Sequence, residues 1–153
     1  MKIILLNPPF KPEYGKFSRS SRSPAITKSG TLYYPIWLSY ACGLLEKNGH
    51  EVCLIDSCAE QIDLNLTLQK IEGFQPNLVV VDTSTPTIEN DVKCADVIKG
   101  LDSSIFICLV GTHPSVLTDE VLNMSNSVDA VARHEYDETL VQLAKALTQK
   151  TDL

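Results

Sequence analysis

Five short apolar runs, separated by longer segments of mixed polarity, constrain the fold of this chain more than any other feature. A short apolar run without alternation is typical of a strand that is buried on both faces of a parallel sheet. Each run ends at a polar residue, a glycine or a proline, as strands do. The predicted strands cover residues 2–7, 51–56, 77–82, 105–110 and 127–131.

The segments between these runs have helical periodicity, and strands that alternate with helices pair in parallel through right-handed crossovers. We therefore predict the α/β class, as a flavodoxin-like, doubly wound, five-stranded parallel sheet of order 2-1-3-4-5 with helices on both faces. The predicted helices cover 34–48, 61–73, 88–100, 115–124 and a segment that starts near 137. Their predicted buried faces include Trp37, Ala41, Leu44 and Leu45 in the first helix, Ile88, Val92, Ala95 and Ile98 in the third, and Leu117, Val121 and Met124 in the fourth.

The length of 153 residues is that of one domain, which we place at 1–148, followed by a frayed tail at 149–153. The net charge is −6, and serines dilute the basic cluster at 16–28, so we expect no nucleic acid as a partner. No apolar run reaches the ~18 residues of a membrane span. The first run breaks at two prolines, which excludes a signal peptide, and we expect a cytoplasmic protein.

Five cysteines, an odd number without Cys-x-x-Cys spacing, indicate free thiols in a reducing compartment and no metal site. All five are predicted to lie in strands, helices or turns away from the carboxyl edge of the sheet. No nucleophile, base and oxyanion donor are brought together by the predicted fold, so we expect no catalytic residue and no catalysis by this chain alone.

The segment 8–31 is unusually long for a connection inside a compact domain. Loops of this length are commonly functional or mobile. Two interpretations stay open, a loop that faces a ligand or partner and a plain mobile insertion.

Polar residues follow four of the predicted strands and, in the predicted strand order, meet at the carboxyl edge where such sheets bind ligands. They are Asn7–Pro9, Thr83–Thr85, Gly111–His113 and Arg133–Glu135. This edge offers hydroxyls, amides and a glycine, but neither a dinucleotide fingerprint nor a phosphate-binding P-loop. His113 and His134 are either polar loop residues or ligand contacts that can donate or accept protons near neutral pH.

One possible function is that of a receiver-like module, or of another flavodoxin-like module that binds a small ligand or a partner. Asp82 and Thr112 resemble the phosphoacceptor and switch residues of response-regulator receiver domains. Such domains need an acidic pair after the first strand to hold Mg²⁺, and Asn7 and Pro8 stand there. The position after the fifth strand, where receivers have Lys, is Arg133.

Several motifs, in this order and spacing, resemble the N-terminal cobalamin (B12)-binding domain of B12-dependent radical SAM enzymes, such as the anaerobic magnesium-protoporphyrin IX monomethyl ester oxidative cyclases. The parent would then be an oxidative cyclase or a methyltransferase. The motifs are Asn7–Pro9, Tyr34–Ala41, Gly49–Val52, Asp56, Val110–Pro114 and Arg133–Leu140.

The resemblance implies cobalamin as the cofactor, with its nucleotide tail between the loops after the third, fourth and fifth strands and its corrin over the edge. It also implies a radical SAM catalytic domain as partner in the parent enzyme, where the [4Fe–4S] cluster and S-adenosylmethionine reside. The barrel and its Cys-x-x-x-Cys-x-x-Cys motif are absent from this chain. The implied cofactor-binding residues are Asn7, Pro8, Thr83, Ser84, Thr85, Thr87, Gly111, Thr112, His113, Arg133, His134 and Glu135.

The sequence departs from that family at three glycines. Thr112 stands at the second glycine of the family's Gly-Gly pair, and His134 and Tyr136 replace the two glycines of its Arg-Gly-Glu-Gly-Glu run. An Asp-x-His-x-x-Gly motif is absent after the first strand, so we expect no histidine from that loop on the cobalt.

Overall fold

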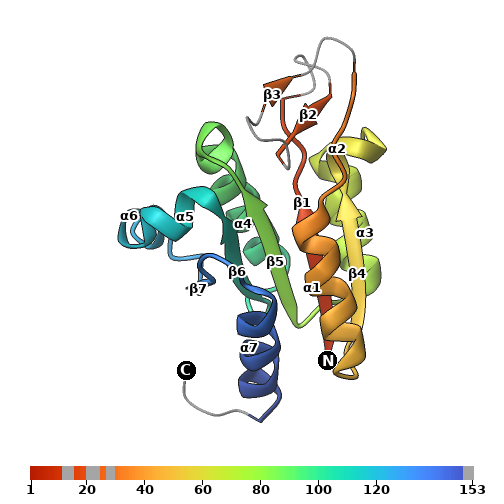
Figure 1. Ribbon diagram of the computed structural model, residues 1–153, viewed down its shortest axis with the longest axis vertical. Coiled ribbons are helices and arrows are strands. Elements are labelled where there is room, and N and C mark those ends of the chain that lie inside the picture. The colour runs from red at the N-terminus through yellow and green to blue at the C-terminus, as the bar shows by residue number, and fades with distance from the viewer. Residues whose placement is uncertain (12–15, 20–24, 27–29, 150–153) are drawn as a thin grey trace.

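A five-stranded parallel sheet forms the centre of the computed structural model, which describes residues 1–11, 16–19, 25–26 and 30–149 (Figure 1). Its strand order is β4-β1-β5-β6-β7, which is 2-1-3-4-5 when these five strands are numbered along the chain, so the predicted α/β topology is confirmed. All neighbouring strands pair in parallel. The strands are β1 (Lys2–Asn7), β4 (Glu51–Asp56), β5 (Leu78–Thr83), β6 (Phe106–Gly111) and β7 (Ala130–Val131).

Helices cover both faces of this sheet (Figure 1). Ile3 and Leu5 of β1 join the core under α1 and α7, and Ile4 and Leu6 join the core under α3, α4 and α6. This alternation follows from the two-residue period of a strand. The helices are α1 (Ile36–Lys47), α2 (Ser57–Glu60), α3 (Leu64–Phe74), α4 (Ile88–Leu101), α5 (Thr112–Val116), α6 (Thr118–Leu122) and α7 (Asp137–Gln149), with a 3-10 turn, η2 (Thr85–Thr87), before α4. None of the helices in the described ranges is both long and apolar enough to cross a membrane.

The predicted buried face is confirmed for α4, whereas in α1 it is confirmed at Ala41 and Leu45 and wrong at Trp37. In α1 the buried residues are Leu38, Ala41 and Leu45, whereas Trp37 is 57% exposed. The buried face is shifted from Trp37 toward Leu38, because the i, i+3, i+7 series of smaller apolar side chains packs on the sheet. Trp37 and Tyr40 lie on the solvent side, with ring centroids 6.2 Å apart.

The predicted helix over 115–124 is wrong, because two short helices, α5 and α6, stand in its place. The helical dihedral angles break at Leu117. There the Thr118 hydroxyl donates to the Pro114 carbonyl at 2.7 Å, and such a local bond competes with a continuous helix. Val121 is buried as predicted, whereas Leu117 and Met124 are exposed.

The long loop after β1 contains a two-stranded antiparallel sheet that the sequence analysis did not predict. Its strands are β2 (Phe17–Ser18) and β3 (Ala25–Ile26), and it lies beyond the carboxyl ends of β1 and β4 (Figure 1). The other parts of the loop at 12–15, 20–24 and 27–29 fall outside the described residues, as does the predicted frayed tail from residue 150 onward.

Candidate functional site

The loops after β5 and β6 are joined directly at the carboxyl edge of the sheet. The Thr83 hydroxyl donates to the Val110 carbonyl at 2.7 Å, across the register that pairs Thr83 with Gly111. One turn further on, Nδ1 of His113 lies 3.3 Å from the Thr85 hydroxyl. The predicted convergence of these two segments is therefore observed.

Gly111 allows the two strand ends to approach closely. Its φ of 119° and ψ of −177° lie in a region that is essentially reserved for glycine. A Cβ atom at this position would lie 2.2 Å from the Thr83 carbonyl oxygen. The glycine is thus required by the backbone of the neighbouring strand, independently of any ligand.

The loops after β6 and β7 are joined through Ser115 of α5, which the sequence analysis missed. Its hydroxyl donates to the Gly111 carbonyl at 2.7 Å and accepts from the His134 amide at 2.9 Å. Nε of Arg133 donates to the Ser115 carbonyl at 3.0 Å. A signal was present in the sequence, since a serine four residues after Gly111 can return a bond to that carbonyl.

After β7, His134 and Tyr136 stand at the two positions where the family that the sequence resembles has glycines. His134 is exposed, whereas Tyr136 is not. His134 has a φ of 57°, a conformation in which a side chain is disfavoured and glycine is not. Arg133, His134 and Glu135 are exposed, as is Thr112 after β6. Tyr136 is buried in the core, and this burial raises the pKa of its hydroxyl.

Of the four hydroxyl residues at the end of β5 and in the turn after it, three are buried and bond to their own or the neighbouring strand end. Thr83, Ser84 and Thr87 are buried, and the hydroxyls of Ser84 and Thr87 lie 2.8 Å apart. Ser84 caps the start of η2, and the Thr87 hydroxyl at its end accepts a hydrogen bond from the Ser84 amide. The turn is therefore fixed at both ends. Thr85 contacts Nδ1 of His113 but is exposed, so it is the member of this group that a ligand can reach.

His113 carries an unpaired polar atom at the point where these loops meet. Its ring uses Nδ1 toward Thr85, and its Nε2 is buried without a hydrogen-bond partner among the residues that the structure describes. A buried polar atom without a partner costs free energy, on the order of 1–3 kcal/mol. A hydrogen-bonding group brought within reach of Nε2 would remove this cost.

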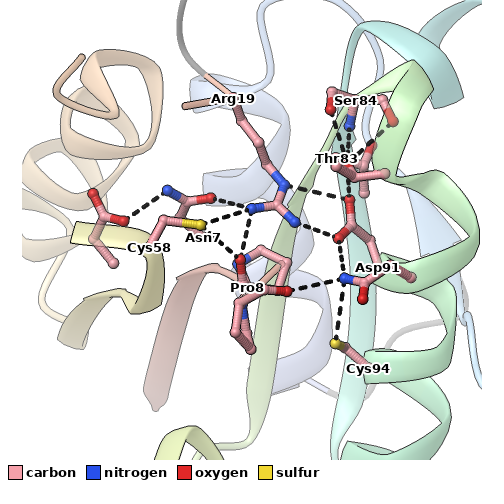
Figure 2. Close-up of polar contacts among 12 residues, drawn as sticks. Asn7, Pro8, Arg19, Cys58, Thr83, Ser84, Asp91 and Cys94 are labelled. Carbon is pink, nitrogen blue, oxygen red and sulfur yellow. Dashed lines mark hydrogen bonds and ion pairs between the residues drawn. The ribbon is translucent and has the colours of Figure 1, made fainter. Parts of the chain in front are cut away.

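A buried ion pair lies between the ends of β1 and β5, at the topological switch point of the sheet (Figure 2). Nη2 of Arg19, from the loop after β1, lies 2.6 Å from Oδ1 of Asp91 on α4, and both side chains are almost fully buried. Nη1 of Arg19 donates to the Asn7 side chain at 2.9 Å and to the Pro8 carbonyl at 2.6 Å. The predicted edge residues Asn7 and Pro8 therefore hold the loop in place.

Sequence reasoning missed both members of this pair. A signal existed for Asp91, which interrupts the apolar face of α4 three residues after Ile88. The expectation that every cysteine lies away from the edge is also wrong, because Cys58 follows β4 on α2, and Nη1 of Arg19 lies 3.3 Å from its sulfur. Burial raises the pKa of this thiol, so it is a neutral structural group and a weak nucleophile.

Asp82, the residue of the receiver-like alternative, is half-buried at the end of β5. Burial raises its pKa to about 7, against the opposing effect of Arg19 and with a further contribution from Asp91. Arg19 lies on Asn7 and Pro8, where a receiver would hold its acidic pair, and the described residues contain no cluster of three metal-ligating side chains. The site does not favour the receiver-like alternative.

Comparison with known proteins decides the family, because a model of the B12 binding domain matches residues 22–144. The chain belongs to the B12-binding domain family. The match includes the loops after β5, β6 and β7 that form the edge described above.

Two curated relatives are longer proteins. An uncharacterized methyltransferase of Pyrococcus horikoshii is 25% identical over 153 residues, which are all of this chain and 31% of the relative. An anaerobic magnesium-protoporphyrin IX monomethyl ester cyclase of Cereibacter sphaeroides is 28% identical over 113 residues, which are 73% of this chain and 18% of the relative. The chain thus spans less than a third of the length of these relatives.

Solved structures confirm the fold. A cobalamin-binding protein from Desulfitobacterium hafniense superposes with a TM-score of 0.62 at 15% identity, over 95% of this chain and 58% of that one. A two-component response regulator of the LuxR family from Aurantimonas gives 0.59 at 16% identity, over 98% and 86%. At these low sequence identities, the structural similarity shows a shared sheet architecture and carries no conclusion about function.

The edge fits the cofactor that family membership implies. The nucleotide tail of cobalamin carries phosphate and ribose oxygens, which need hydrogen-bond partners. Nε2 of His113 lacks a partner among the described residues, and Thr85 and Thr112 expose hydroxyls next to it in the chain or in space. These groups are uncharged and could supply hydrogen bonds to the oxygens of such a tail.

Proposed function

We propose that this domain holds cobalamin at the carboxyl edge of its sheet. The nucleotide tail lies between the loops after β5, β6 and β7, and the corrin lies over the edge. The observation that carries the proposal is the contact of His113 with Thr85, which leaves Nε2 of the histidine buried and unpartnered among the described residues.

The proposed contacts divide into two groups. Thr85, Thr112, His113, Arg133, His134 and Glu135 offer side chains to the cofactor, since all but the half-buried His113 are exposed. Asn7, Pro8, Thr83, Ser84, Thr87 and Gly111 shape the loops, because their polar groups already bond within the protein or, for Gly111, because the backbone needs the space.

We further propose that the parent protein is a B12-dependent radical SAM enzyme similar to the magnesium-protoporphyrin cyclases or to a methyltransferase. The names of the two relatives support this, and their greater length leaves room for a catalytic domain. In such an enzyme the [4Fe–4S] cluster, S-adenosylmethionine and the cobalt carry the chemistry. This chain binds and orients the cofactor, and its loop after β1 supplies no histidine to the cobalt.

The test is retention of hydroxocobalamin through gel filtration, followed by the visible spectrum of the protein peak. We expect one equivalent to co-elute with the wild type and substantially less with His113→Ala. His50→Ala is the matched control, because its Nε2 is also buried without a partner among the described residues, but it lies in the turn between α1 and β4 at the opposite edge. A folded wild type that retains no cobalamin contradicts the proposal.

A further inference from the structure

Arg19 connects the loop after β1 to helix α4, which lies far from it in the chain. It lies directly after β2 in the loop that follows β1, and it is 5% exposed. Its guanidinium group bonds to Asn7 and Pro8 at the end of β1 on one side and to Asp91 on the other (Figure 2). Arg19 therefore places a buried positive charge at the topological switch point of the sheet, and this charge is both ion-paired and hydrogen-bonded.

Asp91 extends this connection to the turn after β5. Its Oδ1 accepts from Nη2 of Arg19 at 2.6 Å, and its Oδ2 accepts from the Thr87 hydroxyl at 2.5 Å. The Thr87 hydroxyl in turn lies 2.8 Å from the Ser84 hydroxyl and accepts from the Ser84 amide at 3.3 Å. The bonds thus run without interruption from Arg19 to both ends of the turn that contains Thr85.

We propose that Arg19 is a positioning residue, which acts through Asp91 and Thr87 to fix the turn 84–87 in the conformation that presents Thr85 to the ligand. The inference rests on the proposed cobalamin site and adds the loop after β1 to it. Arg19 touches no part of the cofactor in this account. Arg19 therefore supports the site from the loop after β1, and its ion pair with Asp91 holds it against α4.

Two variants remove the two ends of this connection. Arg19→Gln removes the ion pair, and Thr87→Val keeps the ion pair but removes the hydroxyl that joins Asp91 to the turn. We expect each to weaken hydroxocobalamin binding about tenfold, and the double variant to weaken it no further, since residues in one network act as a unit. Additive losses, or an unchanged dissociation constant in both single variants, overturn the inference.

A second ion pair on the same helix provides the control. Lys99 near the end of α4 lies 2.7 Å from Asp129, at the opposite edge of the sheet. Lys99→Gln breaks a pair of α4 without touching the turn, and we expect it to leave the dissociation constant within twofold of the wild type. If Lys99→Gln also weakens hydroxocobalamin binding tenfold, general destabilisation explains the losses in the other variants, and the inference is overturned.

Amide hydrogen exchange separates failure of this inference from failure of the proposed function, because it needs no cofactor. In Arg19→Gln and in Thr87→Val we expect the amides of 84–87 to exchange at least tenfold faster than in the wild type, and in Lys99→Gln to stay unchanged. Unchanged exchange at 84–87 in folded Arg19→Gln or Thr87→Val overturns the positioning role. Absence of cobalamin binding by the wild type contradicts the proposed function, and the exchange result then still decides this inference.

Discussion

Replacing Gly111 with alanine tests whether the edge of the sheet is built as described. The backbone conformation of Gly111 costs about 1–3 kcal/mol for any other residue. The added Cβ atom would also lie 2.2 Å from the Thr83 carbonyl oxygen, and relieving such overpacking costs about 1–3 kcal/mol. The loss of unfolded-state entropy returns about 0.4–1 kcal/mol, so the free energy of unfolding should fall by about 1–6 kcal/mol.

Urea denaturation followed by circular dichroism measures this change, and Gly43→Ala provides the control. Gly43 lies inside α1, and a Cβ atom there meets nothing within 4 Å. Alanine at this position should stabilise the protein by about 0.5–1 kcal/mol, which is the opposite sign. An unchanged urea midpoint for Gly111→Ala would contradict the close approach of β5 and β6 at Gly111.

Three further predictions concern His134, Asp82 and the buried face of α1. His134→Val should destabilise the protein by about 1–2 kcal/mol, since a β-branched residue tolerates a φ of 57° poorly, whereas His134→Gly should not; thermal unfolding of both variants decides this. Because burial raises the folded pKa of Asp82 to about 7, above its ordinary value near 4, folding favours the protonated carboxyl, and stability is lost as the pH rises from about 4 to 7. Asp82→Asn should therefore gain stability relative to the wild type across this interval in urea titrations at several pH values, and a constant difference contradicts the assignment. Leu38→Ala should cost about 2–5 kcal/mol and Trp37→Ala less than about 1 kcal/mol in the same assay, and the reverse order would restore the face predicted from the sequence.

Local patterns in the sequence were sufficient to predict the sheet. The run 2–7 is apolar because β1 is buried on both faces, and its predicted bounds agree with the observed strand. The face of α4 was also predictable, because Ile88, Val92 and Ala95 follow the helical period. In α1 the period was ambiguous, because large apolar residues occupy more than one face, and packing against the sheet selected Leu38 over Trp37.

The polar contacts of the site depend on tertiary structure, and the sequence alone did not predict them. Arg19 and Asp91 are 72 residues apart, and no spacing rule connects a residue in a long loop to a helix on the far side of a strand. The sequence did place Gly111 at the edge, among the residues that the resemblance implies for the cofactor. The structure adds a reason for the glycine that needs no ligand, because the neighbouring carbonyl of Thr83 already occupies the space beside it.

Hydrogen exchange of the wild type with and without hydroxocobalamin tests the central claim most directly. The account predicts that saturation with the cofactor slows exchange in peptides that cover 83–87, 111–116 and 133–136, while peptides from the opposite edge, such as 48–51, are unchanged. Protection that is absent, or that falls at the opposite edge instead, would contradict the claim that the carboxyl edge of this sheet holds cobalamin.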